Sequence, residues 1–455
     1  MEDSTTRLQD NAETNVPEIA QVQPAASGAA AQGSSTVPWR VQIPIYFAGF
    51  FSNSLTDVSS IVLPIWLATH DASAAMIGVV IGARHILPFF FAIHGGALMD
   101  RYGAKKLMLA CCMLSVVTLP MIPLVGWLPG VFVLQMINGY GAAIGWLGSQ
   151  TLFGQNMHGS HVMAGRFAFV LRMGGFVGPP LAGLAWDHTG VIGGFAFLTV
   201  WAMGTVVCSL LVPAPDESVS PDSRKKFKAS DMIPRLSDYR DAARLAAVPG
   251  MSIVLMITVI RIGASSVQDS FYPLYLSTIG FSATEIGILV TISSAIAAAG
   301  ALLVGPVVRY VPAIWTLILS TAFSIIFVSV TPLLTAFPML AITASLRGLG
   351  MGLSQPLMLS MLIEASGRGS QGKGAALRTT ANRAAAALTP TGMGIAAAYA
   401  GLASSFFVVG GVMMAAIIVI ALHIRRRPGI TYWSYDGVAK PNTPGIPHAP
   451  CCNRV

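Results

Sequence analysis

The sequence predicts an all-α membrane protein of two six-helix transmembrane bundles that are related as a repeat, with both termini in the cytoplasm. Three observations predict this fold class: the composition, the spacing of apolar runs, and residue matches between the two halves of the chain. Of the 455 residues, 54% are hydrophobic and only 10% are charged. A soluble globular domain has far more charge than this, so lipid is the expected solvent.

Apolar runs recur at the length that a membrane-spanning helix needs. About 20 apolar residues cross a hydrocarbon core of about 30 Å as a helix. Twelve such runs occur, at about 42–67, 76–99, 107–126, 130–153, 165–187, 191–212, 250–276, 285–308, 313–332, 337–363, 375–399 and 401–424. The predicted organisation is a disordered tail (1–41), a first bundle (42–212), a linker (213–249), a second bundle (250–424) and a second tail (425–455). The second part of the linker fits an interfacial helix or a solvated loop.

The placement of Lys and Arg predicts the orientation in the membrane. With a cytoplasmic N-terminus, the tails and every second connection contain basic residues, among them Arg40, Arg101, Lys105, Arg309 and Arg425. The six opposite connections contain none. This positive-inside asymmetry predicts that both termini are cytoplasmic. Membrane topology thus accounts for the net charge of +8 without nucleic-acid binding.

Residues of the first bundle match residues of the second at a nearly constant offset, as expected of a repeat. An ordered series of matches favours common descent, because apolar composition alone gives scattered ones. Pairs at an offset of 209 include Pro64/Pro273, Gly78/Gly287, Asn138/Arg347 and Gly139/Gly348, and pairs at 211 include Arg172/Arg383, Pro179/Pro390 and Gly183/Gly394.

The connection between the second and third spans combines glycines with charges of both signs. Its main residues are Gly96, Asp100, Arg101, Gly103 and Lys105. This segment resembles the signature loop of the major facilitator superfamily. The resemblance implies a twelve-helix secondary transporter that works by alternating access, in which Asp100 and Arg101 brace one of two conformations. A positive-inside anchor without a gating role is the alternative.

Three features bear on how closely the chain follows that family. The matching loop of the second half contains Arg309 but no acid, and the family's arginine on the fourth helix falls on Gln135. The fifth span contains Gly174, Gly178, Pro179 and Gly183, which is similar to the glycine-proline motif of the antiporter branches. This motif favours export slightly, although tight helix packing explains it equally well.

Polar residues within the spans are the candidates for a substrate or coupling pathway, since a charge in mid-bilayer costs about 2.5 to 3.5 kcal/mol even on lenient scales. In the seventh span Arg261, Ser265, Gln268 and Tyr272 fall on one helix face, beside Asp269. In the family, helices 1, 4, 7 and 10 line the central cavity. The predicted pathway residues are Asp57, Gln135, Asn138, Arg261, Gln268, Asp269, Tyr272 and Arg347.

Arginines outnumber acids within the spans, because Arg84, Arg172 and Arg383 add further buried positive charge. A cationic cavity would attract an anionic or electron-rich substrate, with Asp57 or Asp269 as proton site or counter-ion. In the alternative, the arginines pair with these acids or with helix carbonyls and do not contact substrate.

The predicted function is secondary active transport of a small organic solute, coupled to an ion such as the proton, with a slight lean to export of a drug or metabolite. Uptake of an anionic or heteroaromatic nutrient such as a vitamin is one alternative, and a non-transporting receptor is another. The sequence contains no hydrolase constellation and no ATP-binding loop, and the His158–His161 spacing has no third metal ligand of matching kind near it. We therefore expect no enzymatic activity and no cofactor. The expected partners are a small-molecule substrate, a coupling ion and the lipid bilayer, in a multi-pass plasma-membrane protein of the bacterial inner membrane.

Overall fold

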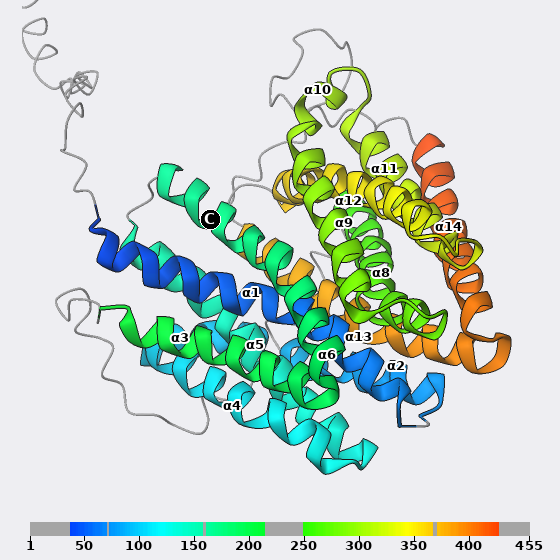
Figure 1. Cartoon of the computed structure of the whole chain (residues 1–455). Helices are drawn as coiled ribbons and strands as arrows, with labels where there is room; N and C mark the ends of the chain where they lie inside the picture. Colours follow the sequence, from blue (N-terminus) through cyan, green and yellow to red (C-terminus); the bar gives the residue numbers. More distant parts are fainter. Residues whose placement is uncertain (1–36, 71, 158–160, 214–248, 367–370, 427–455) are drawn as a thin grey trace, which may run out of the picture. The chain divides into compact units, whose positions relative to one another are not determined.

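A computed structural model describes residues 37–70, 72–157, 161–213, 249–366 and 371–426. All regular secondary structure in these ranges is helical (Figure 1), which confirms the all-α class. The chain divides into residues 1–38 and a second unit that begins at Trp39. All the helices described below belong to the second unit.

The first half contains six helical elements. They are α1 (Trp39–Ala68), α2 (Ala74–Ala83), α3 (Ile86–Tyr102), α4 (Ala104–Val125), α5 (Leu128–Asn156) and α6 (His161–Leu211). α6 is two helices joined at Gly190, whose φ of 63° and ψ of −144° interrupt the helix. Glycine adopts this backbone without a Cβ clash. The predicted spans 165–187 and 191–212 lie on the two sides of this interruption.

The second half contains the remaining elements. They are α8 (Pro249–Thr278), α9 (Ala283–Leu302), α10 (Val304–Val308), α11 (Ala313–Ser329), a 3₁₀ turn (Thr331–Leu333), α12 (Phe337–Ser366), α13 (Gln371–Ala400) and α14 (Leu402–Arg425). The linker, including its predicted interfacial helix, and most of both tails lie outside the described residues. At the N-terminal boundary the first helix begins at Trp39, slightly earlier than predicted.

Two predicted continuous spans, 76–99 and 285–308, are broken in the structure. The breaks lie at Arg84–His85 and at Leu303. A proline ring clashes with the carbonyl four residues before it and lacks an N–H. Pro88 and Pro306 stand in the first turns of α3 and α10, so each accounts for the break just before it. The first break frees the carbonyl of Arg84 from helical bonding within α2.

Several of these helices have the length and composition of membrane spans. Eight described helices are long and apolar enough to cross a membrane, and α6 covers two of the predicted spans. α1, α12 and α13 are not among the eight. α12 contains Arg347, and α13 contains Arg378 and Arg383. The chain is thus a multi-pass membrane protein, whereas the total of twelve spans and the side of the termini stay predictions.

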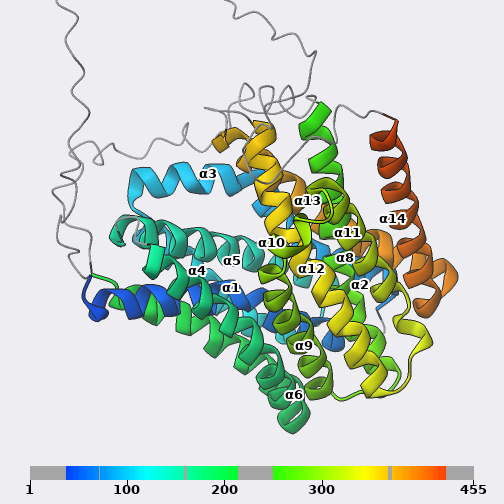
Figure 2. The same ribbon diagram turned by 90° about the horizontal axis from the view of Figure 1, so that it is seen from above.

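Contacts between the halves follow the repeat. α2 packs on α13, and α6 packs on α9 (Figures 1 and 2). Gly78 of α2 lies against the carbonyl of Pro390, and Gly287 of α9 lies against the carbonyl of Pro179. Gly287 and Pro390 are the repeat partners of Gly78 and Pro179. The two interfaces are therefore built from the same contact in two copies.

Equivalent hydrogen bonds also occur within the first half and within the second half. Ser115 Oγ donates to the Asn138 carbonyl at 3.4 Å, and Ser324 Oγ donates to the Arg347 carbonyl at 3.3 Å. Both residues of the second bond lie 209 positions after those of the first. Repeated contacts of this kind support the internal repeat independently of residue identity, because Asn138 and Arg347 are chemically different.

Gly139 of α5 offers a test of this packing, because a Cβ there would run into the freed carbonyl of Arg84. We expect Gly139→Ala to lower the melting temperature of the detergent-solubilised protein, since overpacking costs about 1 to 3 kcal/mol. Gly154→Ala is the matched control on α5, because no atom lies within 4 Å of its added Cβ. Alanine stabilises an open helix position by about 0.5 to 1 kcal/mol, so the control should be neutral or more stable. Equal melting curves for both variants would contradict the close approach.

Candidate functional site

A polar cavity of about 390 Å³ lies among α1, α2, α5 and α13. Its ionisable lining residues are Asp57 on α1, Arg84 and His85 at the break after α2, and Arg383 on α13. Asn53, Asn138 and Trp146 add polar and aromatic surface. Because α13 belongs to the second half, the cavity is built by both halves of the repeat.

The break after α2 gives the cavity two adjacent nitrogen-rich side chains. Arg84 Nε donates to His85 Nε2 at 3.2 Å. Since Nε2 accepts this bond, the proton of a neutral imidazole is assigned to Nδ1. Nδ1 is buried and has no hydrogen-bond partner in the structure. The site therefore holds a donor that a bound acceptor could satisfy.

Arg84 is the centre of a charged network that joins the halves. It interacts electrostatically with both Asp57 and Asp269. Asp269, on α8, also interacts with Arg347 of α12, and Arg383 of α13 interacts with Arg84. The network thus contains three arginines and two acids, so it has an excess of positive charge.

Arg347 joins the predicted polar face of α8 to α12. Its side chain is only 2% exposed, and its guanidinium carbon lies 4.7 Å from the centroid of the Tyr272 ring. A cation over an aromatic face is favourable. Nε and Nη2 of Arg347 have no partner. These two atoms are therefore available to an acceptor on a ligand.

Arg261 on α8 and Arg378 on α13 form a pair of neighbouring arginines. The sequence analysis identified Arg261 but not Arg378. Arg261 is 6% exposed and has Arg378 as its electrostatic neighbour. The Nε atoms of both residues and Oδ1 of Asn382 are buried without a partner. The spacing of Arg378 and Asn382, one helical turn apart on α13, was a signal that could have identified them.

The other predicted pathway residues differ in their surroundings. Asn138 lines the cavity, whereas Gln135 and Gln268 are buried and do not line it. Both amide atoms of Gln135 lack partners. The prediction that Arg172 is buried is wrong, because its side chain is exposed. The face of α6 that packs on α1 contains Leu171 and Gly174 instead.

The predicted gate loop is mostly helix. α3 continues to Tyr102, and Gly103, with a φ of 91°, alone separates it from α4. Lys105 Nζ donates to the carbonyls of Leu210, at 3.0 Å, and Val212, and so caps the end of α6. Gly96, Asp100 and Arg101 lie on α3, but their surroundings are outside what the structure describes. Bracing by Asp100 and Arg101 stays a prediction.

The glycine-proline motif of the fifth span is a packing surface in the structure. Gly174 lies against Ser54, and Gly178 lies against Val58, both on α1. Gly183 lies against the carbonyl of Ala283, while Pro179 receives Gly287 of α9 as described above. Helix packing therefore accounts for all four motif residues, which favours the alternative reading of the motif.

Asp187 of α6 makes three hydrogen bonds to the second half, and the sequence analysis did not single it out. Its Oδ1 accepts from the backbone N of Ala283 at 3.0 Å. Its Oδ2 accepts from Thr284, at 2.8 Å from N and 2.6 Å from Oγ1. Asp187 of α6 thus caps the first turn of α9, where anionic groups are favoured.

Comparison with known proteins gives a family model and several solved structures. The model described as Major Facilitator Superfamily matches residues 45–263 and 254–434. No curated protein matches the sequence. The nucleoside transporter NupG is 15% identical, with a TM-score of 0.66 over 85% of this chain and 99% of that chain.

Two further structures show the same fold. A POT family transporter in complex with a thioalcohol-conjugated peptide is 13% identical, with a TM-score of 0.66 over 86% of this chain and 96% of that chain. A bacterial homologue of the human lysosomal transporter Spinster, inward-facing and unoccupied, is 14% identical, with a TM-score of 0.60 over 85% of this chain and 95% of that chain. At these identities the likeness shows the fold alone.

Proposed function

Because the chain belongs to the major facilitator superfamily, we propose that it is a secondary active transporter of a small organic anion that works by alternating access. The observation that supports an anionic substrate is the set of buried arginine donors without partners. Nε of Arg261 and Nε and Nη2 of Arg347 are in this set. The plasma membrane of a bacterium is the proposed location.

Unpartnered buried donors are costly, which is why they point to a ligand. A buried polar group without a hydrogen bond costs about 1 to 3 kcal/mol, and more when it is charged. A carboxylate or phosphate supplies paired acceptors that match the guanidinium fork. The cavity of about 390 Å³ falls within the usual range for small-molecule sites. Arg84 lines this cavity, whereas Arg347 does not line it and is linked to Arg84 through Asp269. An organic anion that extends from the cavity at Arg84 to Arg347 would satisfy the two unpartnered donors of Arg347.

Ion coupling is proposed to depend on Asp57 and Asp269. Both acids interact with Arg84, so each competes with a substrate anion for the same guanidinium. Protonation of one acid removes its attraction for Arg84 and leaves that arginine to the substrate. Proton binding and anion binding would then favour each other, as symport requires. A non-transporting receptor would need no such competition.

Alternating access is proposed to involve the two repeat-related interfaces. The contacts of Gly78 with Pro390 and of Gly287 with Pro179 bring α2 to α13 and α6 to α9. Both contacts lie near the N-terminal ends of α2 and α9, on the side opposite the predicted cytoplasmic face. We propose that they close the pathway on that side and separate when the halves rock about the central site.

Uptake and export are the two directions of transport that the site could serve. The predicted preference for export depended on the glycine-proline motif. Packing of the motif residues against α1 and α9 accounts for their presence. The arginine-rich network suits uptake of an anionic nutrient and export of an anionic metabolite equally. Flux measured with inside-out and right-side-out vesicles separates these two directions.

Neutralising Asp57 or Asp269 tests whether these acids couple transport to proton movement. In proteoliposomes with an imposed pH gradient, wild-type protein should accumulate a member of a panel of small carboxylates and heteroaromatic anions. We expect Asp57→Asn or Asp269→Asn to lose gradient-driven accumulation while keeping exchange of labelled for unlabelled substrate, because exchange requires no net proton movement. Glu285→Gln, which alters only the N-terminal capping box of α9, should behave as wild type.

Three outcomes would reject parts of the proposal. Transport of only neutral or cationic solutes would reject an anionic substrate. Retention of gradient-driven accumulation in both Asp variants would reject their role in coupling. Binding without flux for every ligand that binds would favour the receptor instead of the transporter.

A further inference from the structure

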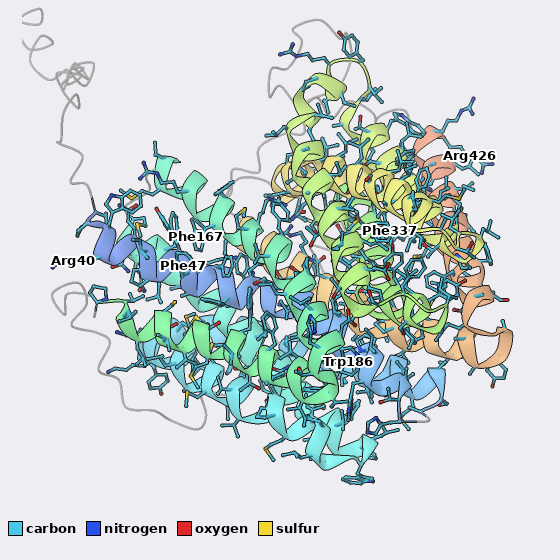
Figure 3. All side chains as sticks on the ribbon, viewed as in Figure 1. Arg40, Phe47, Phe167, Trp186, Phe337 and Arg426 are labelled. Carbon is cyan, nitrogen blue, oxygen red and sulfur yellow. The ribbon has the colours of Figure 1, made fainter. Side chains whose placement is uncertain are left out.

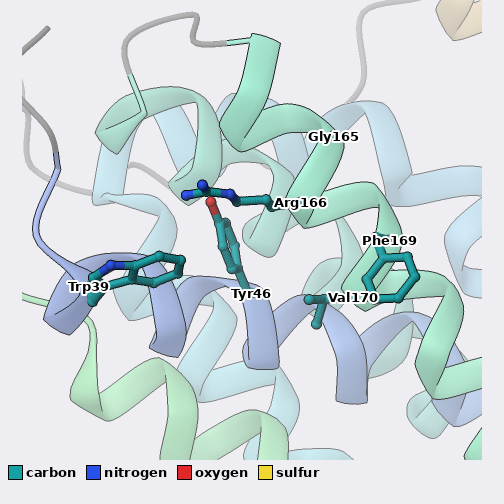
Figure 4. Close-up of a pocket in the computed structure, with 6 residues that line it drawn as sticks. All are labelled: Trp39, Tyr46, Gly165, Arg166, Phe169 and Val170. Carbon is teal, nitrogen blue, oxygen red and sulfur yellow. The ribbon is translucent and has the colours of Figure 1, made fainter.

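A groove with a cavity of about 450 Å³ lies between the beginnings of α1 and α6, and it shares no lining residue with the central cavity. Trp39 and Tyr46 of α1 line one side (Figure 4). Gly165, Arg166, Phe169 and Val170 of α6 line the other. None of these six residues is acidic, so the charge of Arg166 is not neutralised by the groove itself.

Arg166 is held at the mouth of the groove by aromatic side chains. Its guanidinium carbon lies 5.0 Å from the centroid of the Trp39 ring. Figure 4 shows the Tyr46 hydroxyl directed toward the guanidinium. That hydroxyl donates to Gln42 Oε1 at 2.9 Å, which fixes the ring position. The arginine thus lies over the Trp39 ring and remains exposed.

Positively charged residues lie at one end of the groove and apolar residues follow them. This order matches the headgroup and acyl chain of an anionic phospholipid. Trp39 and Arg40 begin α1, where Figure 3 labels Arg40. Arg166 lies near the beginning of α6 and lines the groove with Trp39. One turn further along α6, Phe169 is 66% exposed, and Val170 lies beside it. Trp at a span end is typical of the membrane–water interface. An anionic headgroup would meet the arginines there, and an acyl chain would follow the apolar residues toward the bilayer centre.

We propose that this groove is a binding site for one anionic phospholipid. Its headgroup phosphate accepts hydrogen bonds from Arg166, with Arg40 adding charge, and its first acyl carbons pack on Phe169 and Val170. Basic pockets between transmembrane helices on the cytoplasmic side are suited to such headgroups. The site is independent of the transported substrate, because none of its residues lines the central cavity.

Lipid counting in nanodiscs tests the site without any transport assay. Full-length protein is reconstituted in nanodiscs of mixed phosphatidylglycerol and phosphatidylcholine. It is then released from the nanodiscs, and the lipids that it retains are counted by native mass spectrometry. We expect wild type to retain one more phosphatidylglycerol than Arg166→Ala. The variant's affinity for that lipid should fall roughly fivefold, as expected for one arginine at the surface. Arg309→Ala, which removes an exposed arginine at the end of α10, is the matched control and should retain the lipid.

A second measurement places the lipid at the groove. Phosphatidylglycerol brominated near the headgroup should quench wild-type Trp fluorescence more than the equivalent phosphatidylcholine, and Trp39→Phe should remove the difference. Equal phosphatidylglycerol retention by wild type and Arg166→Ala would overturn the proposal. Displacement of the lipid by inorganic phosphate would also overturn it, because the groove would then be a site for a soluble anion. Arg166→Gln provides a second variant if the alanine protein does not fold.

Discussion

Arg347→Ala is expected to reduce transport about 100-fold or more while the protein remains inserted and folded. Arg347 is buried on α12, with two guanidinium nitrogens that have no partner in the structure. A hydrogen bond to a charged group contributes about 1.5 to 3 kcal/mol, so loss of a bidentate pair to the substrate corresponds to about two or more powers of ten. Initial flux of a substrate from the anion panel measures the effect.

We expect the Arg347→Ala variant to fold, because the arginine that it removes has unsatisfied buried donors. The guanidinium of Arg347 lies over the Tyr272 ring and interacts with Asp269, but its Nε and Nη2 have no partner, so the alanine variant removes two buried donors that are unsatisfied. Arg347→Lys keeps the charge but loses the fork, and we expect flux between that of wild type and of the alanine variant. Arg309→Ala, at an exposed arginine that ends α10 and does not line the cavity, should transport normally. Arg261→Ala should also abolish transport, and wild-type flux in either alanine variant would exclude that residue from the mechanism.

The fold was predictable because membrane burial leaves a strong trace in composition. The predicted spans fall on described helices, with 76–99 and 285–308 each divided between two of them, and the offset of 209 relates real contacts such as those of Ser115 and Ser324. The breaks within spans were missed, since apolar runs continue across them. Pro88 and Pro306 held the relevant information, because each proline disrupts the turn before it.

The site was predicted only in part, because helix periodicity shows which residues share a face but not which faces meet. Asp57, Asn138, Asp269 and Arg347 were identified from their cost in a bilayer. Arg84 interacts with Asp57 and Asp269, and Asp269 interacts with Arg347, while Asn138 lines the cavity with Asp57. Arg172 has the same apparent cost but is exposed. Its repeat partner Arg383 lines the cavity. Identical residues at equivalent positions can therefore have different surroundings when the partner helices differ.

Asp187→Ala is expected to weaken closure between α6 and α9 and to shift the balance of conformations about 30-fold or more. The variant loses three hydrogen bonds to the first turn of α9 and the interaction of a carboxylate with the helix dipole. A net loss of about 2 to 3 kcal/mol corresponds to a factor of about 30 to 150 in a two-state equilibrium. The repeat-related interface has no such acid, because the position 211 residues after Asp187 is Ala398.

Spin labels at Ile192 and Leu333, both exposed and near the closed ends of the two halves, would report this shift by pulsed distance measurement in a chain without native cysteines. We expect a longer distance to gain population in Asp187→Ala. Thr284→Val removes only the Oγ1 bond and leaves both backbone bonds, so it should produce a smaller shift of about fivefold. Asp187→Asn, which keeps the shape but not the charge, should fall between the two. An unchanged distance distribution in the alanine variant would show that packing of Gly183 and Gly287, and not the carboxylate, holds this interface closed.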